Sequence, residues 1–335
     1  MKGPVRLAAA AALLAFLPLR IEAVPFSTVT VFGDSTVDPG NAQAAALGLG
    51  LADPAPAALG YFNGRFTNGL TYADRLNIEF GSGSAFAPAI TVVSGTVVPV
   101  PGQTNFAVGG AEALAENPLD PIEGGSSLAA QLALYQTVTG VADPNALYLF
   151  NIGGNDVRES LDDALAAGSV AGETADIQDT VNAILGSISV LSAAGADQFL
   201  VANVSNVGLF PERGGDPLAI MLGDQLSSLF NTTLQAGLAG LGSGLGLDIS
   251  VLDLAALQDD VFSNMLLADL VQPCVVPGVP AVCPDPEERL FYDPIHLTAA
   301  AQQIVFDRAA ASLVPVPASA AFLLLGLAAV RRARR

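Results

Sequence analysis

Five short and almost wholly apolar segments constrain the fold of this chain more than any other feature of its sequence. They are rich in Val, Ile, Leu, Phe and Tyr and end in small or polar residues. The segments are Ser27–Phe32, Thr104–Val108, Ala146–Ile152, Gln198–Val204 and Asp248–Leu254. Strands with a near-continuous apolar character are buried on both faces, as they are in a parallel sheet.

Longer stretches with helical patterning separate these strands. They are Asn68–Phe80, Ser126–Val138, Thr174–Ala194, Asp224–Leu241 and Thr298–Ser312. Regular alternation of strand and helix predicts an α/β doubly wound fold with a five-stranded parallel sheet. Residues 81–103, which are rich in Gly, Ser, Val and Pro, predict a hairpin or an excursion over the site.

The charge balance argues against nucleic acid as a partner. The formal net charge is -19 and Lys2 is the only lysine, whereas phosphate contacts need clustered Lys and Arg. An acidic surface keeps a protein soluble and disfavours anionic partners. We take the acidity as a sign of a saline or extracellular habitat, and we expect a monomer.

Both ends of the chain differ from its middle. Residues 1–23 carry Lys2 and Arg6, then an apolar run and a small residue at Ala23, which predicts a signal peptide. An amphipathic or buried first helix is the alternative. Residues 313–335 contain a Val-Pro-Val-Pro motif, an apolar run and a terminal Arg cluster. That run is too short to span a bilayer, which takes about 20 residues. We therefore expect one domain over residues 24–312.

Cys274 and Cys283 are the only cysteines and lie in a Pro-rich loop. In an exported protein they suit a short disulfide. With one His and no other thiol in the chain, a zinc site is not expected. No cofactor is expected either.

Four polar segments follow the predicted strands or precede the last helix. In an open α/β sheet, the carboxyl ends of the strands form the edge where ligands bind. The segments are Gly33-Asp34-Ser35, Asn105–Gly110, Gly153–Asp156 and Asp293–His296. Taken singly, each segment is explained as well by a simple turn as by a functional site.

His296 is the only histidine in the chain, and a lone His is more often structural than catalytic. Proton transfer from a serine at neutral pH nevertheless uses His most often. Asp293, three residues earlier, is placed to orient the ring. Together the four segments predict a site for nucleophilic catalysis.

The order and context of these segments resemble the SGNH, or GDSL, hydrolase superfamily. The motifs that carry the resemblance are Phe32–Asn41, Phe62–Gly69, Asn105–Gly110, Gly153–Asp156 and Phe291–His296. The resemblance implies a three-layer, flavodoxin-like α/β/α fold. The phrases FGDS, FNGRFTNG and NFAVGGA look like the lipase and thermolabile-hemolysin branch, which acts on carboxylic esters. A G-x-S-x-G nucleophile elbow is absent from the chain, which disfavours the larger α/β-hydrolase class.

Family likeness implies Ser35 as nucleophile, His296 as base and Asp293 as the acid that orients it. It also implies an oxyanion hole made by the Ser35 N–H, the Gly109 N–H and the Asn155 side chain, with Gly110 as the alternative to Gly109. Asp34 and Asp156 are expected to shape turns. Arg65 and Arg158 are expected to form surface salt bridges, with contact to substrate as the alternative.

The tail resembles the PEP-CTERM sorting signal of Gram-negative bacteria, although the usual Glu is absent. That resemblance implies an exosortase-like processing enzyme as a partner, transient membrane anchoring, and a final location in the periplasm, at the cell surface or in the extracellular matrix. A simple membrane anchor is the alternative. The sequence thus predicts a secreted serine esterase or lipase acting on a small-molecule or lipid ester. An acyltransferase and an exported glycan- or lipid-binding matrix protein remain as alternatives.

Overall fold

The computed structural model describes residues 26–115, 123–276, 278–279 and 281–313. The expected signal peptide lies outside the described residues, as does all of the expected sorting segment except Leu313. No helix in the described ranges combines the length and apolar character that crossing a bilayer requires.

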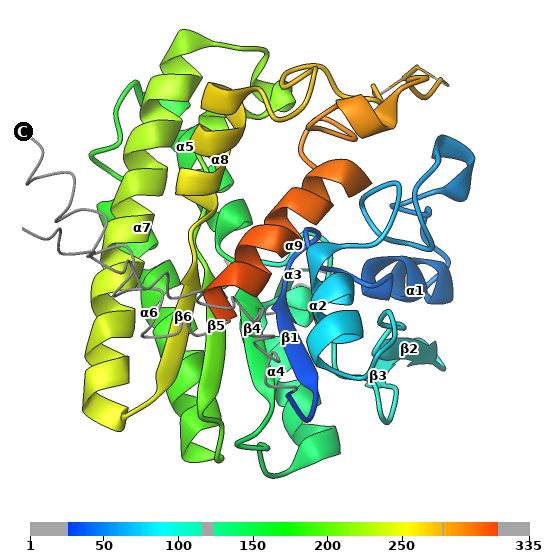
Figure 1. Cartoon of the computed structure of the whole chain (residues 1–335), viewed down its shortest axis with the longest axis vertical. Coiled ribbons are helices and arrows are strands. Elements are labelled where there is room, and N and C mark those ends of the chain that lie inside the picture. The colour runs from blue at the N-terminus through cyan, green and yellow to red at the C-terminus, as the bar shows by residue number, and fades with distance from the viewer. Residues whose placement is uncertain (1–25, 116–122, 277, 280, 314–335) are drawn as a thin grey trace, which may run out of the picture.

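Four parallel strands form the central sheet in the order β1-β4-β5-β6. They are β1 (Val29–Gly33), β4 (Leu147–Asn151), β5 (Gln198–Ala202) and β6 (Asp248–Leu252). Figure 1 shows them side by side, with the last helix crossing in front of them. Their carboxyl ends lie at one edge because all the pairs are parallel and in step, with Gly33 opposite Asn151.

Side chains of each strand alternate between two cores, because successive Cβ atoms point to opposite faces of a sheet. In β4, Tyr148 and Phe150 join one core while Leu147 and Leu149 join the other. The first core is largely aromatic, with Phe32 and Phe150 ring centroids 5.2 Å apart. Both faces are therefore apolar, as the near-continuous strands predict.

Helices cover both faces and complete the three layers (Figure 1). Those packed with the aromatic core are α4 (Leu128–Thr139), α5 (Gly154–Ala167), α6 (Thr174–Ala193) and α7 (Pro217–Leu245). Those on the opposite face are α2 (Tyr72–Phe80), α8 (Leu254–Asn264) and α9 (Ala299–Leu313). Two short helices, α1 (Asn41–Gly48) and α3 (Glu123–Ser126), complete the set in the described ranges. This architecture confirms the predicted α/β class.

The predicted strand at Thr104–Val108 is wrong, and the sheet of the described residues has four strands rather than five. This segment runs beside β1 but forms only a single bridge, between Val31 and Asn105. Its backbone still bonds to β1: Thr104 accepts the Val31 N–H, and the N–H groups of Phe106 and Val108 donate to carbonyls of β1. Side chains bind the backbone groups of the residues in between. Asn41 Nδ2 donates to the carbonyls of Asn105 and Ala107, and Asn105 Oδ1 accepts the Ala107 N–H.

The predicted hairpin in residues 81–103 is present as β2 (Ile90–Val93) and β3 (Thr96–Pro99), an antiparallel pair away from the sheet. The helix predicted from Asn68 begins only at Tyr72, because Thr71 and Asp74 form a capping box there. Asn68 instead accepts the Ala299 N–H with its side chain and so ties this segment to the start of α9.

Candidate active site

Ser35 lies in the tight turn that follows β1. Asp34 shapes this turn, because its Oδ1 accepts the Thr36 N–H at 2.9 Å and its carbonyl accepts the Val37 N–H. Gly33 is required at the end of the strand, since a Cβ there would lie 2.6 Å from the Asn151 carbonyl oxygen. Burial raises the pKa of Asp34 despite its hydrogen bonds to Thr36.

His296 lies in a closed loop immediately before α9. Phe291 and Leu297 form a bridge across this loop, and the Tyr292 N–H donates to the His296 carbonyl at 2.7 Å. Asp293 Oδ1 accepts the backbone N–H groups of Ile295 and His296, which is the local turn that Asp favours. The loop thereby brings the Asp293 carboxylate to the imidazole ring of His296.

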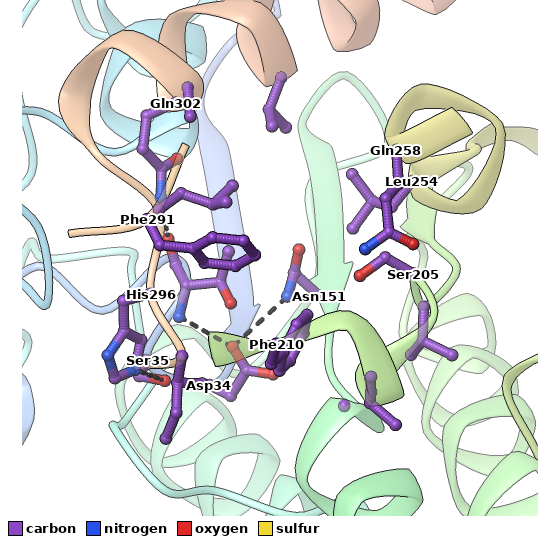
Figure 2. Close-up of a pocket in the computed structure, with 18 of the residues that line it drawn as sticks. Asp34, Ser35, Asn151, Ser205, Phe210, Leu254, Gln258, Phe291, His296 and Gln302 are labelled. Atoms are coloured by element: carbon purple, nitrogen blue, oxygen red, sulfur yellow. Dashed lines mark hydrogen bonds between the residues drawn. The ribbon is translucent and has the colours of Figure 1, made fainter. Parts of the chain in front are cut away.

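The structure brings Ser35, His296 and Asp293 into one line of hydrogen bonds, of which Figure 2 shows the bond between Ser35 and His296. His296 Nε2 lies 2.7 Å from Ser35 Oγ, and His296 Nδ1 lies 2.7 Å from Asp293 Oδ2. Burial opposes ionisation of Asp293, but the charge of His296 and hydrogen bonds from His296 and Tyr61 lower its pKa to about 2. Asp293 is therefore an anion that can stabilise a protonated imidazole.

Tyr61 is a contact of this line that the sequence reasoning missed. Its hydroxyl donates to Asp293 Oδ2 at 2.7 Å, and its ring packs edge-on against Tyr292. Burial and the charge of Asp293 raise the pKa of Tyr61, so the phenol stays protonated and a donor. The residue immediately precedes the FNGRFTNG phrase, and no signal in the sequence marks it.

The FNGRFTNG phrase forms a wall of the site through Phe66. The Phe66 ring lies 4.9 Å from the His296 ring, measured between centroids. Arg65 is buried in a salt bridge to Asp74 with a distance of 2.7 Å, rather than lying in a surface pair as expected. A Cβ at Gly109 would lie 2.3 Å from the Phe66 ring, so this position requires glycine.

Gly109 does not have a free N–H, contrary to its expected role in an oxyanion hole. That N–H donates to Asp38 Oδ2 at 2.7 Å. Asp38 also accepts N–H groups at the start of α1, from Gly40, Asn41 and Ala42. Burial raises the pKa of Asp38 to about 6 against these four bonds. Within the described ranges, neither the Gly110 N–H nor the Ser35 N–H has an acceptor in the protein.

Asn155 lies in the first turn of α5 and faces the same site as Ser35 and His296. Its Nδ2 donates to the Ala111 carbonyl at 2.8 Å, and its Oδ1 accepts from Arg158 at 2.9 Å. Arg158 is held in turn by a salt bridge to Glu212. These contacts fix the amide so that its second N–H is available to a ligand.

Cys274 and Cys283 form the expected disulfide. It lies beside the His296 loop, since the Cys274 N–H donates to the Phe291 carbonyl and the Val275 N–H to the Tyr292 carbonyl. In the described part of the chain, no group of three His, Cys, Asp or Glu side chains is arranged to hold a metal ion.

Comparisons with known proteins place the chain in a family. Residues 29–309 match the model of the GDSL-like lipase/acylhydrolase family. The esterases EstA of Pseudomonas aeruginosa and of Pseudomonas putida are each 29% identical over 347 residues. These matches cover 89% of this chain and 49% of each relative, so the chain spans about half the length of these relatives.

Solved structures of low identity are similar as well. A member of the lipolytic G-D-S-L family from Veillonella parvula has a TM-score of 0.38 at 10% identity, covering 84% of this chain and 95% of that one. A variant of the acetyl xylan esterase Axe2 from Geobacillus stearothermophilus has a TM-score of 0.42 at 14% identity, covering 87% and 97%. At these scores neither similarity bears on the activity. The family match covers most of the chain, and the chain therefore belongs to the GDSL-like lipase/acylhydrolase family.

Proposed function

We propose that this chain is a serine esterase that hydrolyses carboxylic esters through Ser35, His296 and Asp293. The observation that carries the proposal is the unbroken line of hydrogen bonds from Ser35 Oγ through the imidazole of His296 to the ionised Asp293. A nucleophile, a base within 2.7 Å and a group that orients the base are what acyl transfer requires. Membership of a lipase/acylhydrolase family supports the same reaction class.

In the first half of the reaction, Ser35 Oγ attacks the ester carbonyl carbon while His296 Nε2 takes its proton. The carbonyl oxygen becomes an oxyanion, which the N–H groups of Ser35 and Gly110 and the amide of Asn155 stabilise. Asp293 stabilises the imidazolium that forms. His296 then returns the proton to the departing alcohol, which leaves an acyl group on Ser35.

In the second half, water attacks the acyl carbonyl and His296 takes its proton. The tetrahedral intermediate forms in the same oxyanion hole. It collapses by breaking the bond between the acyl carbon and Ser35 Oγ while His296 returns the proton to Ser35 Oγ, which releases the carboxylic acid and regenerates the free serine. The protein's own side chains account for every proton transfer in this cycle.

Replacement of the nucleophile tests the proposal. Ser35→Ala is expected to lower kcat for p-nitrophenyl ester hydrolysis about 10⁴-fold or more. A fluorophosphonate probe is expected to label wild type and not the variant. Ser243→Ala, an exposed position on α7, is the matched control and should behave as wild type. Equal hydrolysis by wild type and Ser35→Ala would overturn the proposal.

Export of the enzyme is a second part of the proposal, with a signal peptide at 1–23, a catalytic domain at 24–312 and a sorting or anchoring tail at 313–335. The Cys274–Cys283 disulfide supports it, because disulfides persist in oxidising compartments. Fractionation of a Gram-negative host should find the full chain outside the cytoplasm. Removal of residues 1–23 should retain it inside, and removal of 313–335 should lower its membrane-associated share.

A further inference from the structure

An apolar cavity extends inward from Ser35 and His296 at the carboxyl edge of the sheet (Figure 2). The loop that follows β5 (203–210), helix α8 and helix α9 line it. Its volume is about 140 Å³. A dry cavity of about 150 Å³ in another protein holds benzene, so this one has room for roughly six carbon atoms.

Two helices present apolar faces to this cavity. On α8 the lining residues Leu254, Leu257 and Val261 are spaced i, i+3 and i+7, which places them on one face. On α9, Ala301 and Val305 are one turn apart and both face the cavity. Along α8 this lining extends over about 10 Å, from the rise of 1.5 Å per residue.

Three of the polar side chains on the lining, those of Asn151, Gln258 and Gln302, are already engaged by the protein. Asn151 Oδ1 accepts from the Tyr72 hydroxyl, and its Nδ2 donates to Asp34. Gln302 binds the Tyr72 N–H and the Thr36 carbonyl. Gln258 binds the backbone of Asn206 in both directions. These groups leave little for a polar ligand, so an occupant with no hydrogen-bonding groups of its own fits the cavity best.

We propose that this cavity binds the acyl chain of the ester and selects chains of about six to eight carbons. The inference rests on the proposed esterase function and adds the substrate class. Ser35 and His296 line the same cavity, so an acyl group bonded to Ser35 Oγ has its first carbons at the cavity wall. The alcohol part of the ester then faces outward, where it leaves without crossing the cavity.

The profile of activity against acyl length follows from burial. Each CH₂ transferred from water into an apolar site is worth roughly fourfold in binding. For the full chain, kcat/KM should rise from acetyl to hexanoyl and octanoyl p-nitrophenyl esters. It should fall for palmitoyl, whose chain exceeds the cavity.

Variants of the cavity wall test its role. Ala301→Phe puts a ring into the cavity and should lower the ratio of kcat/KM for the octanoyl ester to that for the acetyl ester by about tenfold or more. Ala311→Phe is the matched control, since Ala311 is exposed on the same helix and outside the cavity. Leu257→Ala enlarges the cavity and should move the preference to longer chains.

Failure of this inference is distinguishable from failure of the proposed function. Suppose that kcat/KM does not vary with acyl length, that Ala301→Phe and Leu257→Ala do not change this, and that Ser35→Ala is inactive. This result would overturn the acyl-binding site but leave the proposed esterase function intact. If no ester is hydrolysed, calorimetry with sodium octanoate decides the acyl site on its own. Octanoate binding by wild type and Ala311→Phe but not by Ala301→Phe supports the cavity as the site, and equal binding by all three overturns it.

Discussion

At the scale of single residues, the hydrogen bond from Tyr61 to Asp293 leads to the most direct prediction about activity. It donates to the same oxygen of Asp293 that lies against His296. A hydrogen bond to a charged group contributes about 1.5–3 kcal/mol. We therefore expect Tyr61→Phe to lower kcat by roughly tenfold with little change in KM, because it loosens the orientation of the base without touching substrate.

Tyr292→Phe is the control for that prediction. Its hydroxyl donates to the Leu59 carbonyl rather than to Asp293, and its ring contacts the ring of Tyr61. Steady-state kinetics and thermal unfolding of both variants separate the two effects. Equal losses of kcat in the two variants would show that Tyr61 acts only through packing.

Asp38 links the nucleophile turn to the glycine pair, which makes it a second positioning residue. Its carboxylate accepts the Gly109 N–H, and the next residue, Gly110, is the oxyanion donor that we propose. An amide in place of the carboxylate has one oxygen acceptor instead of two. Asp38→Asn should therefore lower kcat by about 10²-fold, the usual size for a misplaced oxyanion donor, with KM less affected. A change in KM alone would contradict this role.

The sequence identified the candidate site residues whose amino-acid type suits catalysis and which lie in a motif. Ser35, Asp293 and His296 come from segments that the fold brings together over 261 residues. The sequence alone could not show which of Gly109 and Gly110 has an N–H available to an oxyanion. That depends on which of the two N–H groups binds the Asp38 carboxylate in the folded chain. Tyr61 has no motif, and only the packing of the 57–61 segment against the His296 loop places its hydroxyl.

At the scale of elements, the disulfide loop is tied to the loop that carries His296. Residues 274 and 275 pair with 291 and 292 through the backbone, so the crosslink braces the segment just before Asp293. The two cysteines are separated by 9 positions in the sequence. A crosslink over a loop of this length stabilises the folded state by roughly 2–3 kcal/mol, because it lowers the entropy of the unfolded chain. The double variant Cys274→Ser with Cys283→Ser should lose about that much in urea unfolding and also lose part of kcat.

Reducing agent supplies the control for that variant. Dithiothreitol should lower the activity of wild type to that of the double variant and leave the double variant unchanged. Wild-type kinetics that do not change on reduction would show that the His296 loop holds its geometry without the crosslink.

Prediction of the elements succeeded for the central strands, where apolar patterning is strong, and failed at the edge of the sheet beside β1. β4, β5 and β6 were predicted because each is continuous and buried or backed by the core. The Thr104–Val108 segment has the same composition and three backbone hydrogen bonds to β1, yet it forms a single bridge rather than a regular strand. Helix α5 went unrecognised because its start, Gly154 and Asn155, has the composition of a polar turn.

At the scale of the whole molecule, buried carboxyl groups set the pH dependence of stability. Burial raises the pKa of Asp34, and that of Asp38 and Asp156 to about 6, from a normal 3.8. A raised folded-state pKa gives stability that is full below the unfolded pKa and is lost as pH rises through the folded one. The free energy of unfolding should therefore increase from pH 8 to about pH 5.

Asp293 reverses this trend in acid. Its pKa is lowered to about 2, so the stability it contributes is present above the unfolded pKa and is lost as pH falls toward 2. Urea unfolding at several pH values should find a maximum at about pH 4–5, and Asp156→Asn should flatten the slope above it. Stability that is constant between pH 5 and 8 would contradict the prediction.

The turn after β1, which carries Ser35, contacts the loop before α9, which carries His296. This contact has a consequence for when the site can form during synthesis of the chain. Ser35 and its base are 261 residues apart in sequence. At about 5–20 residues per second, roughly 13–50 s separate the emergence of the two from the ribosome. Throughout that interval the nascent chain carries the proposed nucleophile without its proposed base, so the proposed ester hydrolysis cannot begin. The proposed hydrolytic capacity would then arise only after His296 has emerged and the loop before α9 has folded.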